Sequence, residues 1–156
     1  MKHVFVVSAL AAALAACGSK SKSETTTDTG TTSGVALTAE NWASMDLDTR
    51  AKYMDEVVVP TMAPLFSGFD AQEFAKVDCA TCHGEGAQTG DFEMPSPSLD
   101  ALSPEMIMNP DEDHKAITEF MMAQIKPTMA KLLGKPEYTP ETPDGFGCFG
   151  CHPMAQ

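Results

Sequence analysis

The chain has 156 residues, among them five cysteines, eleven methionines, eleven prolines and eleven glycines, and its formal net charge at pH 7 is -12. So negative a charge argues against nucleic acid or an anionic membrane surface as a partner. It favours a positively charged protein surface, although an acidic surface also serves solubility alone.

The amino-terminal residues 1–16, MKHVFVVSALAAALAA, combine Lys2 with a short apolar run and small residues, which is typical of a secretory signal peptide. The run ends in LAAC, which resembles the lipobox of bacterial lipoproteins. We therefore predict that Cys17 becomes the lipidated first residue; the alternative is an ordinary signal peptide followed by a free cysteine. Residues 17–40 are rich in Ser, Thr and Gly and are expected to form a flexible tether.

These features place the protein in a bacterial cell envelope, lipid-anchored and facing the periplasm. Gly18 follows the predicted lipidated cysteine, where some bacteria use an aspartate to retain lipoproteins in the inner membrane, and this favours the outer membrane.

Residues 41–156 are expected to form one small domain built from two repeated units, at about 44–100 and about 103–156. The tetrapeptide PTMA occurs at 60–63 and again at 127–130, each time ahead of a CxxCH pentapeptide, with a period of 67 to 69 residues. Apolar residues at helical spacing surround each copy: Met54, Val58, Met62 and Leu65 in the first, and Ile117, Met121, Ile125, Met129 and Leu132 in the second. The predicted fold is mainly α with long loops, as two tandem helix-loop-CxxCH units. Because a proline opens each PTMA, we expect a kink or a new helix start there.

The segment between the units is rich in Gly, Pro and acidic residues. It is expected to be a loop around the first unit's site, with a short helix after Ser103.

Two pentapeptides contain every cysteine except Cys17: Cys79, Cys82 and His83 belong to the first, and Cys148, Cys151 and His152 to the second. CxxCH is the attachment signature of c-type haem. Two thiols three positions apart can each form a thioether to a porphyrin vinyl group, and the next residue offers an imidazole to the iron. A zinc site or a redox disulfide needs no histidine after both cysteine pairs. We predict two haem c groups, with His83 and His152 as proximal ligands.

Each haem iron then has one face left for a sixth ligand. Only Pro153 to Gln156 follow His152, and Met154 is too near in sequence to cross to the other haem face, so the ligand must come from upstream. Met62 and Met129 share position, neighbours and distance to a CxxCH, and we predict them as distal ligands. Met54 and Met121 lie on the same stripes, Met94 and His114 are further alternatives, and simple core packing remains open for any of these methionines.

A helix that carries a methionine, followed by a turn and CxxCH, and duplicated along the chain, resembles the repeat unit of the cytochrome subunit of bacterial photosynthetic reaction centres. The resemblance covers residues 47–152 in the order of elements; that subunit has four such units and this chain has two. It implies His/Met ligation, through Met62 with Cys79, Cys82 and His83, and through Met129 with Cys148, Cys151 and His152.

The resulting functional prediction is a membrane-anchored dihaem cytochrome c that transfers single electrons between redox proteins of the cell envelope and has no catalytic residues. Its partners are expected to carry a basic docking surface. The alternatives are a dihaem redox enzyme such as a peroxidase, or a haem-containing subunit or sensor of a larger respiratory complex.

Overall fold

The structure, a computed structural model, describes residues 37–156. Helical segments make up 53% of this part of the chain, which contains no β-strand. The prediction of a mainly helical fold with long loops is confirmed. The predicted signal peptide, Cys17 and nearly all of the tether lie outside the described residues. Within residues 37–156, no helix has both the length and the hydropathy needed to cross a membrane.

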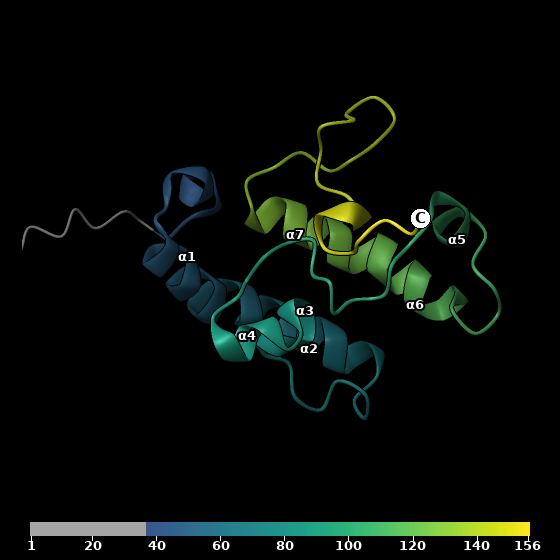
Figure 1. The fold of residues 1–156 in the computed structure, drawn as a ribbon, viewed down its shortest axis with the longest axis horizontal. Helices are drawn as coiled ribbons and strands as arrows, with labels where there is room; N and C mark the ends of the chain where they lie inside the picture. The colour runs from purple at the N-terminus through teal and green to yellow at the C-terminus, as the bar shows by residue number, and fades with distance from the viewer. Residues whose placement is uncertain (1–36) are drawn as a thin grey trace, which may run out of the picture. The chain divides into compact units, whose positions relative to one another are not determined.

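The first long helical segment is continuous and consists of three elements (Figure 1). These are α1 (Leu47–Tyr53), a π-helical turn η2 (Met54–Val58) and α2 (Val59–Phe69), preceded by the 3-10 helix η1 (Ala39–Ser44). Asp46 starts α1, because its side chain accepts a hydrogen bond from the Thr49 backbone N–H at 2.7 Å. This bond satisfies an amide that has no partner within the helix.

The second long helical segment repeats this order. It consists of α6 (Lys115–Phe120), a π-helical turn η3 (Met121–Ile125) and α7 (Lys126–Leu132). The two π turns begin at Met54 and Met121, which are separated by the same interval as Pro60 and Pro127. The internal repeat of the sequence is therefore also a repeat of backbone geometry.

The prolines explain why each helix contains a π turn. A proline inside an α-helix removes one hydrogen bond, and its ring clashes with the carbonyl four residues earlier. Pro60 and Pro127 each lie two positions after the last residue of a π turn. The first turn is closed by the Val59 N–H, which donates to the Met54 carbonyl. The second is closed by the Lys126 N–H, which donates to the Met121 carbonyl. The wider turn lets the helix continue through the proline, where the sequence predicted a kink or a new start.

The two long segments pack against each other in antiparallel fashion. Phe120, near the start of the second segment, contacts the end of the first, with its ring 4.5 Å from Phe69 and 5.6 Å from Phe66. At the other end, the Tyr53 hydroxyl donates a hydrogen bond to the Leu132 carbonyl at 2.7 Å. The core cluster between them consists of Met45, Tyr53, Val58, Met62, Phe66, Phe120 and Ile125.

Replacing Tyr53 with phenylalanine is expected to lower the free energy of unfolding by about 1 to 3 kcal/mol, because the Leu132 carbonyl loses its partner. Tyr53 is only 1% exposed, so water does not readily replace the hydroxyl. Chemical denaturation measures the change. Tyr138 is 47% exposed and provides the matched control; equal losses in the two Tyr→Phe variants would contradict a specific role for the Tyr53 bond.

Short helices and loops complete the fold: α3 (Cys79–His83), α4 (Gly86–Thr89), α5 (Pro104–Met108) and the 3-10 turn η4 (Cys148–Gly150). Ser103 caps α5, since its hydroxyl accepts a hydrogen bond from the Met106 N–H at 3.2 Å. The short helix expected after Ser103 is thus confirmed. Gly84 has φ +62° and lies so close to Ser98 that a Cβ would clash, so the chain after α3 requires glycine.

Candidate functional site

The first CxxCH motif forms the helix α3. Asp78 precedes it in a capping box: its carboxylate accepts from the Ala80 N–H at 2.9 Å, and the Thr81 hydroxyl accepts from the Asp78 N–H at 3.1 Å. Residues three apart in a helical turn share one side. Cys79 and Cys82 therefore lie on the same side of α3, as attachment of both thiols to one planar group requires.

The second motif adopts a similar turn. The N–H groups of Cys151 and His152 both donate to the Cys148 carbonyl, at 3.1 and 2.9 Å. The two cysteines again lie about one turn apart. The same chemical grouping, two thiols followed by an imidazole, is thus presented twice on tight helical turns.

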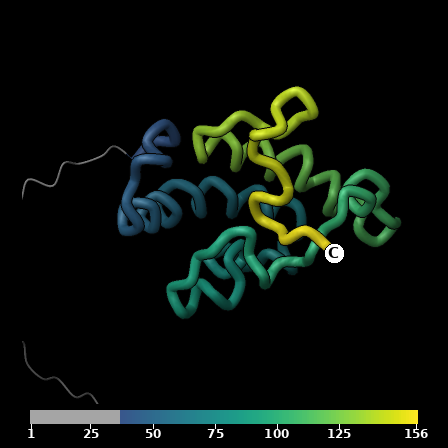
Figure 2. The backbone as a smooth tube through the Cα atoms, turned by 45° about the horizontal axis from the view of Figure 1, so that its top comes forward, coloured from purple at the N-terminus to yellow at the C-terminus, as the bar shows by residue number. Residues whose placement is uncertain are grey.

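The segment between the units packs on the second motif. The Ser96 N–H donates to the Cys151 carbonyl at 2.9 Å, and Leu102 exchanges backbone hydrogen bonds with Pro153 and Ala155 at 2.9 and 2.8 Å. The sequence predicted a loop around the first site; Phe92 of this segment contacts His83 of the first motif, and residues 96–102 bind the second motif. Figure 2 shows the carboxyl-terminal end beside this segment.

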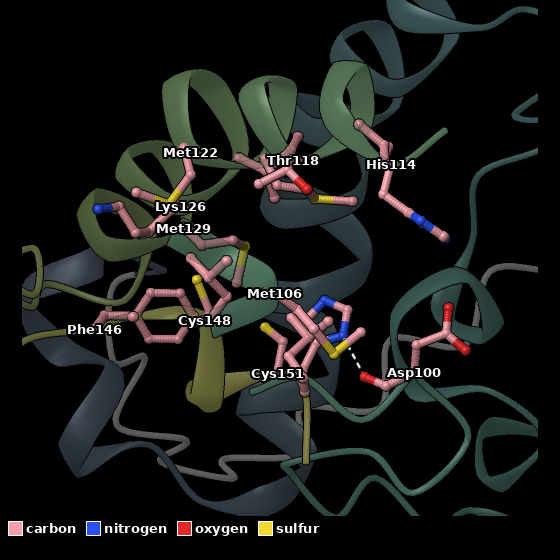
Figure 3. A pocket seen from close by; sticks show the side chains of 17 residues that line it. Asp100, Met106, His114, Thr118, Met122, Lys126, Met129, Phe146, Cys148 and Cys151 are labelled. Carbon is pink, nitrogen blue, oxygen red and sulfur yellow. Dashed lines mark hydrogen bonds between the residues drawn. The ribbon is translucent and has the colours of Figure 1, made fainter. Parts of the chain in front are cut away.

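The His152 ring is oriented by this same segment. Its Nδ1–H donates to the Asp100 carbonyl oxygen at 2.9 Å, because a carbonyl can only accept (Figure 3, dashed line). The proton is then fixed on Nδ1, and Nε2 keeps the lone pair that binds a metal. No sequence signal points to Asp100, since its backbone and not its side chain makes this bond.

A cavity lies between the second motif and the second long helical segment. Its volume is about 170 Å³, and it is partly open to solvent. Met129, Ile125 and Phe146 line it together with Cys148, Cys151 and His152. In Figure 3, Met129 points from α7 into the cavity towards the two cysteines. The structure therefore brings together all four residues predicted for the second site.

Several alternative ligands lie around the same cavity. Met121 and His114 line it, as the sequence alternatives allowed, and so do Met106 of α5 and Met122, which the sequence analysis did not single out. His114 differs from the others, because its Nδ1 bonds the Asp111 carboxylate at 2.6 Å and its side chain is 66% exposed. Met106 could not be recognised from the sequence, because the five residues of α5 are too few to show a helical periodicity of apolar residues.

The residues predicted for the first site have a different environment. None of Met62, Cys79, Cys82 and His83 lines the cavity of the second site. Met62 is 3% exposed and belongs to the core cluster, against which Met54 also packs. Met94 lies in the segment that leads to Ser96. The two repeats thus place their PTMA methionines differently: Met62 within the core and Met129 at its edge.

His83 has a buried ring nitrogen without a partner. Its Nδ1 is shielded from solvent and makes no hydrogen bond among the described residues, while the ring packs edge-on against Phe92 at 5.3 Å. Burial lowers the pKa of His83 below its usual value, which favours the neutral imidazole. A neutral imidazole is the form that ligates a metal.

The half-buried thiols of Cys82 and Cys151 have raised pKa values. Burial raises the pKa of Cys82, and burial, together with the neighbouring Cys82 and Cys148, raises that of Cys151 to about 12. Reactive CxxC pairs of disulfide oxidoreductases show the opposite shift. The two motifs are neighbours in the fold, because Ser96 bonds the Cys151 carbonyl and Ser98 lies against Gly84.

The residues of the second site fit a covalently bound haem c. The apolar cavity is bounded by a thioether sulfur from α7, two thiols one turn apart and an imidazole whose tautomer leaves Nε2 available. This is the donor set that a covalently attached haem with His/Met ligation uses.

Comparison with known proteins adds no relative. A scan against protein-family models, a search of curated proteins and a search of solved structures each gave no match.

Proposed function

We propose that this protein is a membrane-anchored dihaem cytochrome c that carries single electrons between redox proteins of the cell envelope. The observation that supports it best is the cavity in which Met129 lies opposite Cys148, Cys151 and His152. Met129 on α7 lies 19 to 23 positions ahead of the other three residues in sequence, yet all four line one apolar space. The same four residues are those that a His/Met haem c site needs.

Each residue of the second site has a stated role in this proposal. Cys148 and Cys151 would hold the haem through thioether bonds, and His152, through Nε2, and Met129 would be the iron ligands. The haem supplies one-electron redox chemistry between ferric and ferrous iron. The Asp100 carbonyl fixes the His152 ring and apolar side chains surround the site; with His152 and Met129 both bound to the iron, substrate binding there would be disfavoured.

The first site is proposed from the repeat. Cys79, Cys82 and His83 would hold the second haem, with Met62 as its distal ligand. The matched π turns and the capped CxxCH turn support this assignment, and the unpartnered Nδ1 of His83 leaves the orientation of that ring to the bound group. Met62 lies in the core cluster, so its thioether would reach the iron only if that cluster opens on haem binding.

The wider setting of the proposal follows from the sequence. Lipidation of Cys17 and the tether at 17–40 would hold the domain at a periplasmic membrane face, and the acidic charge suits partners with basic surfaces. The order of helix, methionine and CxxCH in each unit resembles that of the repeat unit of the reaction-centre cytochrome subunit.

Reductive titration of the purified holoprotein tests the carrier function. We expect uptake of two electrons per chain, low-spin iron in both oxidation states, and little binding of cyanide by the ferric protein, because both axial positions are filled. Absorption and electron paramagnetic resonance spectra measure these properties. High-spin ferric iron that readily binds cyanide or peroxide would instead favour the dihaem redox enzyme.

A further inference from the structure

A shallow groove adjoins the cavity of the second site, between α5 and α6. Its volume is about 370 Å³. Ile107, Met108, Pro110 and Met122 give it apolar surface, while Glu112, Lys115 and Glu119 give it charge. The groove is therefore open to solvent and offers both apolar and charged side chains to a partner.

The groove and the cavity share a wall. Ile107, Thr118 and Met122 line both of them. Anything bound in the groove would be separated from the contents of the cavity by a single layer of side chains. This is a short route for an electron between a partner and the second site.

Exposed methionines gather around this wall. Of the eight large hydrophobic side chains that are exposed in residues 37–156, Met106, Met108, Met122 and Met154 lie at the second site or next to it. Met108 is 78% exposed and lines the groove but not the cavity, so a group bound in the cavity would leave it uncovered. Flexible methionine surfaces adapt well to partner proteins.

The charge around the groove is negative. Residues 104–122 contain five acidic side chains and one lysine. The acidic side chains also act on His114. Its pKa is raised first by its hydrogen bond to Asp111, and further by the charges of Asp113 and Asp100. A partner with a basic surface is therefore the complementary one.

We propose that the α5–α6 groove is the docking surface for a redox protein whose own electron-transfer site is ringed by lysines, and that one electron passes between that partner and the second haem site across the wall formed by Ile107 and Met122. This rests on the proposed function. The partner's lysines face Glu112 and Glu119, and its apolar contact covers Met108 and Met122.

Binding is tested by nuclear magnetic resonance on the reduced, ¹⁵N-labelled holoprotein, with reduced mitochondrial cytochrome c as a lysine-rich probe. Amide shifts should change within residues 104–122 at low ionic strength, and the changes should disappear at high salt. Shift changes concentrated on α1 or α2, or no changes at all, would overturn the proposal.

Electron transfer to the ferric probe gives a second test. The double variant Glu112→Lys/Glu119→Lys should slow the second-order reaction about tenfold at low salt, because the attraction that steers encounter is reversed. The control Asp48→Lys/Glu56→Lys changes the net charge equally on α1 and η2, away from α5 in Figures 1 and 2, and should be much less affected. Equal slowing in both variants would contradict a local docking surface. Haem content and spectra are recorded for each variant, so that a failure of the groove is distinguished from a failure of haem binding.

Discussion

Replacing Met129 with alanine is expected to abolish the sulfur-to-iron charge-transfer band of the second site and to leave about half of the total intensity, from the remaining His/Met site. Met129 lines the cavity together with His152, and alanine provides no sulfur. The ferric iron of that site should become high-spin and bind cyanide. Absorption and electron paramagnetic resonance spectra of the purified variant measure both changes.

Two further variants make this prediction specific. Met122→Ala removes a methionine from the same cavity wall, yet it should keep the full band, because Met122 also lines the outer groove and is 40% exposed. Met129→His should restore low-spin iron without restoring the band, since imidazole replaces sulfur. If the band were lost in Met121→Ala and kept in Met129→Ala, Met121 would be the ligand.

The double variant Cys148→Ser/Cys151→Ser is expected to contain one haem per chain in place of two. Its free energy of unfolding should fall by at least about 3 kcal/mol, because a large apolar cavity would be left without the group that fills it. The alkaline pyridine spectrum measures haem content, and chemical denaturation measures stability.

Cys17→Ser is the matched control for that double variant. It removes the one cysteine outside the CxxCH motifs, so it should keep both haems and the stability of the domain while releasing the protein from the membrane. Loss of haem in Cys17→Ser, or two haems in the double variant, would contradict the assignment of the cysteines.

Local patterns in the sequence predicted the two long helical segments, and they singled out four residues that line one cavity at the second motif. The three-or-four spacing of apolar residues gave both long helical segments, and the repeated PTMA pointed upstream of CxxCH to Met129, which lies in the cavity with Cys148. These features depend on residues close in sequence or on an exact internal repeat. They need no knowledge of how distant segments pack.

Long-range packing accounts for what the sequence did not reveal. The Asp100 carbonyl that orients His152 is a backbone group, and it reaches the ring because residues 96–102 pack on the second motif. From the repeat, Met62 and Met129 were predicted to have equivalent positions. In the structure, Phe66 and Phe120 pack in the same core cluster as Met62, which is buried there. The sequence repeat makes the two methionines look alike, whereas these aromatic contacts make their burial different.

The most direct test of the account is the number of covalent haems on the intact chain. The protein is produced in the periplasm of a host with c-type haem attachment machinery, and its intact mass and alkaline pyridine spectrum are measured. We expect two haems per chain, attached through Cys79, Cys82, Cys148 and Cys151. A chain with its four motif thiols free to react with an alkylating agent, or with those thiols bound to zinc, would contradict it.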